Sequence, residues 1–450
     1  MTTFVLAALL AAAEASPPPS PEGTVDPDLE EEVASVALRV EVLRGLRFKQ
    51  IPATFRMSEE AHRARLLAEP GPPYVGAQAP ITQERLAARG RAWADVGFGD
   101  PRGPAELDAR LRRDLEGVSV DPAGRTLRAE PWVLPEEDLA PEPGKEAPGA
   151  TLLLTTGVRP DGPPLAHALT HALERQTGPS GQSDDTTDAL LAARAWSEGE
   201  ANLVAVRYLF EAMNLQDEIL AHQVDLGEIA GGRLLPAASA SAPVPVPALL
   251  SFVYEEGFAQ AVAWYKRGGF RAVATAMGTR RTTRDVMHPE RSVPPPRIAG
   301  EQVQFVPSGY RIADKDRLGE QGIVVLVSAG TGKDNLGLLA GDGWSWDTLL
   351  RLEPEQGTGP GATSWRTEWK DASEAAEFAD AYRRVVDARD ASAMVPVEGA
   401  PGRWVLRAGG QVVRVDQQGT EVRVWVAPES MDTAREPAAK PTTEPKPPRR

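Results

Sequence analysis

The sequence contains no cysteine in its 450 residues. We therefore expect neither a disulfide framework nor a cysteine that carries a lipid anchor. After its first residues, the chain contains no apolar run close in length to the roughly 20 residues that a membrane-spanning helix needs. The fold is expected to hold together through its hydrophobic core, and no transmembrane segment is predicted once the start of the chain is removed.

Basic residues are outnumbered, because 49 Lys and Arg stand against 64 Asp and Glu, which gives a formal net charge of −15. Nucleic-acid binding relies on clustered positive charge, so this balance argues against DNA or RNA as a partner. A protein or peptide partner is compatible with it. The composition carries no information on the oligomeric state.

The two ends are expected to lie outside the folded part. Residues 1–15 carry an apolar run followed by Ala-Glu-Ala, which is typical of a signal peptide with its cleavage site. A short anchor or a buried helix is the alternative interpretation. Residues 16–27 read as a Pro-rich linker and residues 429–450 as a disordered tail. The chain is thus predicted to be exported, to the periplasm or outside the cell.

Length and hydrophobic periodicity divide the rest into three parts. They are an N-terminal helical part ending in a β-hairpin (28–135), a helical core (150–296) and a C-terminal α+β domain (297–428). The predicted helices are 29–46, 58–67, 82–94, 105–115, 165–176, 187–213, 252–277 and 372–387. The hairpin strands are 118–120 and 125–129, and the C-terminal strands are 303–306, 322–328, 404–406, 411–415 and 421–426.

Two histidines suggest a metal site on the helix predicted at 165–176. His167 and His171 are four residues apart, so both imidazoles lie on one helical face and can reach a common point. A zinc hydrolase needs a third ligand, and Glu198 in the next helix is our choice. Glu200 and His288 are the remaining candidates, as groups behind the ligands or as alternative ligands. A metal-free histidine pair and a solvated acidic helix face are the competing interpretations.

The general base is where the pattern departs from a hydrolase. In HExxH a glutamate follows the first histidine and takes the proton of the metal-bound water. Here the motif reads HALTH, and that position is Ala168, which can neither accept nor return a proton. The sequence therefore predicts no catalytic residue at the usual place.

Several segments in the same order resemble one family, a set of uncharacterised exported bacterial and archaeal zinc metallopeptidase-like proteins. Their first helix typically reads HELTHALQDQ and their second contains EGDA or EGEA. This chain has LAHALTHALERQ, SEGEANL, GGFRAV and HPE at the corresponding places, and GDGWSWD and WRTEWKDASEAAEF further on. The upstream LEGVSVDPAGRTLRA is similar to the family's hairpin. The resemblance extends from about residue 40 to about residue 390.

The resemblance implies a gluzincin-type fold. The expected fold class is α+β, with a mainly helical zincin-like core, a small β-hairpin or sheet, and the C-terminal α+β domain. It also implies Zn²⁺ as the cofactor, with His167, His171 and Glu198 as its ligands. The family's catalytic glutamate falls on Ala168, and its GGD after tryptophan falls on the segment that ends at Asp347.

Two functions of different class follow. The first is a degenerate, non-catalytic metallopeptidase-like protein that binds a partner or acts as a scaffold through the old cleft, with zinc as a structural pin. The alternative is an active zinc hydrolase with another general base, such as Glu174, Glu255 or Glu256, or an enzyme silenced at Ala168. Four tryptophans are interpreted as packing residues, namely Trp344, Trp346, Trp365 and Trp369.

Overall fold

The fold is known from a computed structural model that describes residues 27–68, 81–111, 117–120, 151–155, 162–177, 185–213, 245–279, 282–290, 306–356, 359–390 and 392–431. The predicted signal peptide, the linker up to residue 26, the strand at 125–129, His222 and the tail beyond residue 431 lie outside these residues. Among the described residues, no helix is both long and apolar enough to cross a lipid bilayer.

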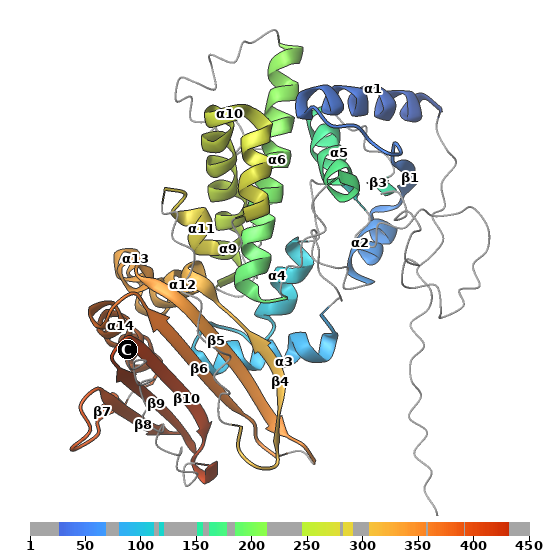
Figure 1. Ribbon diagram of the computed structural model, residues 1–450. Coiled ribbons are helices and arrows are strands. Elements are labelled where there is room, and N and C mark those ends of the chain that lie inside the picture. Colours follow the sequence, from blue (N-terminus) through green and yellow to red (C-terminus); the bar gives the residue numbers. More distant parts are fainter. Residues whose placement is uncertain are drawn as a thin grey trace, which may run out of the picture.

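The first half of the chain is mainly helical and carries a small sheet at its side (Figure 1). The helices are α1 (Pro27–Arg44), α2 (Glu59–Ala68), α3 (Gln83–Val96), α4 (Gly103–Leu111), α5 (Gly162–Thr177), α6 (Thr187–Ala212), α9 (Pro245–Ser251), the π-helix η2 (Phe252–Glu256), α10 (Gly257–Thr279) and α11 (Thr283–Met287). The sheet has the order β1 (Ala53–Met57), β3 (Thr151–Thr155), β2 (Val118–Val120), with β1 parallel and β2 antiparallel to β3. The strand predicted at 118–120 is therefore confirmed.

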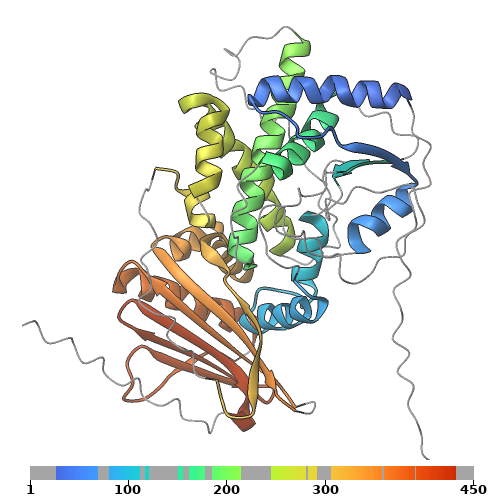
Figure 2. The same cartoon turned by 45° about the vertical axis from the view of Figure 1, so that its right-hand side comes forward.

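Helices α5 and α6 pack side by side, with α1 against both and α10 along α6 (Figure 2). Helix α6 begins where the Thr186 side chain accepts a hydrogen bond from the Ala189 backbone N–H, which satisfies one free donor of the first turn. A buried apolar cluster fills the space between these helices and the small sheet. It includes Val40, Leu154, Leu169 and Leu203.

The second half is an α+β unit built on one antiparallel sheet of seven strands. Its order is β4-β5-β6-β10-β9-β8-β7. The strands are β4 (Tyr310–Asp316), β5 (Trp344–Pro354), β6 (Ala362–Trp369), β7 (Val395–Pro396), β8 (Arg403–Ala408), β9 (Gln411–Gln418) and β10 (Glu421–Pro428), and the helices are α12 (Gly319–Thr331), α13 (Asp334–Gly341), α14 (Ala372–Arg389) and the 3₁₀ turn η3 (Glu429–Met431). Helices α12, α14 and α3 contact this sheet. The overall fold is thus α+β, as predicted.

One C-terminal prediction is wrong, because residues 322–328 belong to helix α12 and not to a strand. The run Ile323 to Val327 is β-branched and apolar, which favours a strand by propensity. All five of its residues are buried, and α12 contacts α6, α9, α13 and α14 on several sides. A helix that is apolar on most of its surface gives no alternation with polar residues, so a short buried helix and a buried strand look alike in sequence.

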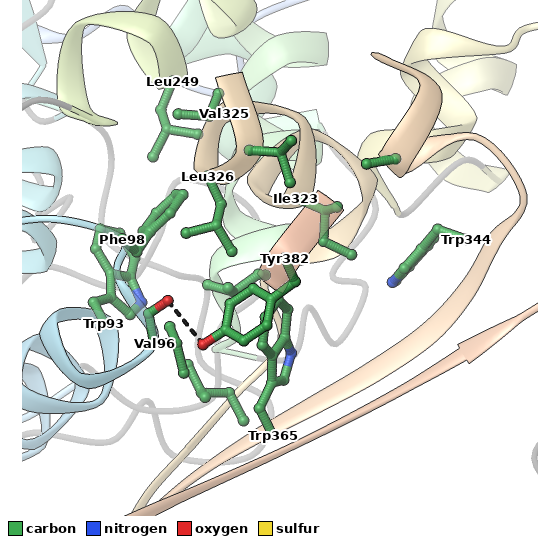
Figure 3. Close-up of a cluster of buried hydrophobic side chains, with 14 of the residues drawn as sticks. Trp93, Val96, Phe98, Leu249, Ile323, Val325, Leu326, Trp344, Trp365 and Tyr382 are labelled. Atoms are coloured by element: carbon green, nitrogen blue, oxygen red, sulfur yellow. Dashed lines mark hydrogen bonds between the residues drawn. The ribbon is translucent and has the colours of Figure 1, made fainter. Parts of the chain in front are cut away.

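The two halves share one hydrophobic core. Figure 3 shows Trp93 and Phe98 from the α3 region meeting Leu326 of α12, with Trp365 of β6 and Tyr382 of α14 beside them. The Tyr382 hydroxyl donates a hydrogen bond to the carbonyl oxygen of Val96 at 3.1 Å. Because this cluster draws on both parts of the chain, the halves bury each other's apolar surface.

Buried charges also join the halves at the start of α6. Asp188 accepts hydrogen bonds from the Arg317 guanidinium at 2.9 Å and from the Thr283 backbone N–H at 2.8 Å. Asp316 of β4 accepts from the backbone N–H of Thr187 at 2.7 Å. These contacts fix the N-terminal end of α6 against the C-terminal sheet, and α6 carries one of the predicted metal ligands.

Candidate metal centre

Three of the predicted site residues converge on one point. The Nε2 atoms of His167 and His171 are 3.1 Å apart. The Glu198 Oε2 atom lies 3.3 Å from the first of these nitrogens and 3.5 Å from the second. The histidines come from consecutive turns of α5 and the carboxylate from the facing side of α6. The structure therefore brings together His167, His171 and Glu198.

The three atoms form a triangle of the size that a tetrahedral zinc ion requires. Zinc binds imidazole nitrogen and carboxylate oxygen at about 2.0–2.1 Å, so two tetrahedral ligands are about 3.3–3.4 Å apart. The three observed distances are 3.1, 3.3 and 3.5 Å. His167 Nδ1 is buried and has no hydrogen-bond partner among the described residues. The three atoms thus match three of the four positions of a tetrahedral zinc ion.

This centre is closed to solvent. His167 is 1 % exposed, and both His171 and Glu198 are 0 % exposed. Ala168, which follows His167, is also fully buried and belongs to the apolar cluster around α5. The 270 Å³ cavity between α3, α9 and α12 is lined by none of these residues. An ion held here would be surrounded by protein.

A hydrogen-bond chain behind His171 orients its ring. The Ser197 hydroxyl donates to Glu174 Oε2 at 2.6 Å and lies 3.0 Å from His171 Nδ1. Because that hydroxyl proton points to Glu174, the ring N–H at Nδ1 donates to Ser197 Oγ. When the ring is neutral, its lone pair therefore lies on His171 Nε2, the atom that faces the centre.

Glu198 is held as a carboxylate. Burial alone would raise the pKa of Glu198, but the guanidinium of Arg194 and the neighbouring His171 outweigh it and lower the pKa well below its usual range. Arg194 lies one turn earlier on α6, with its NH2 atom 3.1 Å from Glu198 Oε1. The other oxygen, Oε2, is therefore the one directed to the histidines, and it carries the negative charge that a cation would need.

Glu200 does not join the centre. Its Oε1 atom pairs with the guanidinium of Arg44, the last residue of α1, at 2.8 Å, and both side chains are buried. Burial raises the pKa of Glu200 well above its usual range. The positive charge of Arg44 lowers this pKa, and the negative charge of Glu174 raises it further. Glu200 thus lies behind the ligands, where it links α6 to α1.

His288 lies elsewhere. It follows α11, and its Nε2 atom is 2.6 Å from Glu320 Oε1 at the start of α12. His62, to which the sequence assigned no role, sits between the hydroxyls of Thr155 and Ser119 at 3.0 and 2.5 Å. Neither histidine is among the three residues of the metal centre.

The four tryptophans act in packing, as predicted. Trp344, Trp365 and Trp369 are buried in the shared core, and Trp346 is half-buried with the guanidinium carbon of Arg317 at 4.1 Å from its ring centre. Asp347 is a buried acceptor of hydrogen bonds. It receives hydrogen bonds from the indole N–H groups of Trp344 and Trp365 and from two backbone N–H groups.

Sequence reasoning missed the residues that support the ligands. The contact of Arg194 could have been predicted from the sequence, because Arg194 lies four residues before Glu198 and residues at this spacing are neighbours on a helix. Ser197 had a weaker signal, as the neighbour of a ligand. Arg44 had none, since it comes from a helix more than 150 positions away in the chain.

Comparisons with known proteins reach only the C-terminal half. A family model described as a domain of unknown function, DUF8575, matches residues 308–436. These residues hold the seven-stranded sheet with α12, α13 and α14, and none of the three converging side chains. No curated protein and no solved structure matches the chain.

Proposed function

We propose that this protein is a degenerate relative of zinc metallopeptidases that holds Zn²⁺ through His167, His171 and Glu198 as a structural centre and does not hydrolyse peptides. The observation that carries the proposal is the buried triangle of ligand atoms with 3.1, 3.3 and 3.5 Å sides. Bound zinc would supply positive charge that ties α5 to α6. The protein itself would be exported and would act by binding a protein or peptide partner.

The surroundings of the ligands support metal binding. Without a cation, two imidazole nitrogens lie against each other and against a buried carboxylate, at distances of 3.1 and 3.3 Å. Structural zinc sites are built from ligands with fixed orientation, and here Ser197 fixes His171 and Arg194 fixes Glu198. Burial adds to this, because charge pairs are stronger away from water.

The same surroundings argue against hydrolysis. A catalytic zinc needs an open coordination position that a water and a substrate can reach. The three ligands are 0–1 % exposed, and a methyl group at Ala168 stands where the general base would be. Because neither the route for a substrate nor the proton acceptor is present among the described residues, a structural centre is the better interpretation.

The acidic residues considered as alternative general bases do not lie where a general base would act. Glu174 contacts Nδ1 of His171, the nitrogen that faces away from the centre, at 3.4 Å. Glu255 is exposed and accepts a hydrogen bond from Ser251 one turn earlier, and Glu256 accepts one from Gln260 one turn later. A general base acts only within hydrogen-bond reach of its proton, so none of these residues favours an active hydrolase.

Elemental analysis of the purified full chain tests the proposal. We expect Zn²⁺ bound in the native chain, and loss of the zinc of this centre from the His167→Ala, His171→Ala variant. The same preparations are incubated with an unfolded protein substrate. We expect no cleavage, because no base stands beside the metal.

The control is His62→Ala, which removes a buried histidine outside the centre. It should leave the zinc content unchanged. Equal zinc in the native chain and the double variant would overturn the metal site, and cleavage by the native chain that a zinc chelator stops would overturn the structural role.

A further inference from the structure

A second group of possible ligands lies at the junction of the two halves, apart from the centre described above. His288 follows α11, Glu320 lies in the first turn of α12, and Asp342 follows α13. One ligand atom from each lies within 4.8 Å of the others. The three residues are far apart in sequence, and only the packing of three helix ends brings them together.

The packing of α12 and α13 explains this convergence. Gly341, directly before Asp342, lies against the side chain of Glu320, and a Cβ on Gly341 would come within 3.4 Å of Glu320 Cγ. The absence of a side chain there lets the end of α13 approach the start of α12. The α11 end is fixed separately, because a capping box of Thr282 and Asp285 starts the helix.

The polar atoms of this group are only partly satisfied. His288 Nε2 and Glu320 Oε1 are 2.6 Å apart. The second oxygen of Glu320, Oε2, is buried and has no hydrogen-bond partner among the described residues, although the whole side chain is only 2 % exposed. A buried carboxylate oxygen without a partner carries a large desolvation cost, so it indicates a missing ligand.

From this geometry we infer that His288, Glu320 and Asp342 form a second binding site for a divalent transition-metal cation such as Zn²⁺. One imidazole and two carboxylates are a donor set that transition metals accept, whereas Mg²⁺ prefers oxygen ligands alone. His288 is 19 % exposed and Asp342 is half-buried, so water can complete the coordination shell from the open side. The site goes beyond the proposed function, since it neither needs nor uses the buried centre.

A cation at this point would join the two halves. Helix α11 belongs to the mainly helical first half, whereas α12 and α13 belong to the C-terminal unit that contains the sheet. A ligand that binds the folded state and not the unfolded chain raises the stability of the fold. We therefore expect added zinc to stabilise the junction of the first half with the C-terminal unit.

Titration of the chelator-treated full chain with Zn²⁺ alone, followed by calorimetry, tests the inference. We expect two equivalents for the native chain. Asp342→Asn should weaken the second binding event by at least about tenfold, because it removes the charge of a ligand and keeps its size. Glu290→Gln is the matched control, since this carboxylate is 64 % exposed and 3.9 Å from His288 Nδ1 but lies outside the group of three.

His167→Ala separates this inference from the proposed function. It should abolish the first binding event and leave the second, together with its dependence on Asp342. Excess Mg²⁺ should not compete for the second site. Unchanged binding in Asp342→Asn, equal loss in Glu290→Gln, or displacement by Mg²⁺ would overturn the site, whatever the buried centre does.

Discussion

At the scale of single residues, Glu198 and the side chains beside it explain how the histidine pair on α5 is held in place. Glu198 keeps its charge through Arg194, and His171 keeps its tautomer through Ser197. Each support contacts the side of the ligand that faces away from the centre. Such outer contacts set the affinity of a metal site, because they decide how the ligands point before the ion arrives.

We therefore predict that Ser197→Ala lowers the affinity for Zn²⁺ by about 10–100-fold. The variant removes the acceptor of the His171 Nδ1 proton and leaves all three ligands in place. Affinity is measured by competition with a coloured zinc chelator. Ser251→Ala is the control, because that hydroxyl bonds Glu255 on the surface. An affinity that is the same in both variants would show that Ser197 does not orient the ligand.

At the scale of elements, the position of Glu198 depends on how closely α6 and α10 approach. Gly199 on α6 and Gly257 at the start of α10 face each other, and a Cβ built on either one would overlap the backbone of the other helix. Glycine in a helix interior costs stability, so its presence here needs a packing reason. Close contact of the two backbones is that reason, and it directs the neighbouring Glu198 to α5.

Gly199→Ala is predicted to lower the free energy of unfolding by about 1–3 kcal/mol, because the added methyl group has no space. It should also weaken zinc binding, since the helix must shift at the residue after Glu198. Urea unfolding and zinc titration measure the two effects. Gly278→Ala, near the end of α10, has nothing within 4 Å of its new Cβ and should leave the fold as stable or slightly more so. Equal stability of the two variants would contradict the close-contact argument.

The helices and strands also differ in how well they could be predicted from the sequence. Long helices were predicted within a few residues, as with 187–213 against Thr187–Ala212 for α6 and 372–387 against Ala372–Arg389 for α14. The convergence of His167, His171 and Glu198 followed from helical spacing and a resemblance. Helix α12 was mistaken for a strand because it is buried on several sides, so its apolar run has no polar face.

Other features left no local signal. Strands β4, β5 and β6 were not predicted. In β5 the charged Arg351 occupies a buried position and interrupts the alternation, whereas β6 alternates regularly, with Arg366 at one of its more exposed positions. These charges are neutralised by partners distant in sequence, for example Asp95 at 2.6 Å from the first arginine. The pairing of Arg44 with Glu200 and the second ligand group depend in the same way on tertiary packing, which local patterns do not encode.

At the scale of the whole molecule, the two halves share both a hydrophobic core and a polar junction. The apolar cluster of Trp93, Phe98, Leu326 and Tyr382 crosses the boundary. Asp347 then ties the sheet to the start of α12, next to the contacts of Asp188. A fold joined in this way is expected to unfold in a single transition.

Asp347 gives the sharpest test of this junction, because four N–H groups donate to its two oxygens at 2.9–3.1 Å. In Asp347→Asn one carboxylate oxygen becomes an NH₂ group. This group cannot accept a hydrogen bond, and it would face the N–H groups that donate to the oxygen in the native chain. Since buried donors without partners are costly, we predict a loss of about 2–4 kcal/mol in the free energy of unfolding, measured with urea. Asp371→Asn is the matched control: Asp371 caps α14 by accepting from Ser373 and Glu374, and asparagine caps a helix about as well. If both variants lose the same small amount, the junction does not depend on Asp347, and cohesion of the halves must come from the apolar cluster alone.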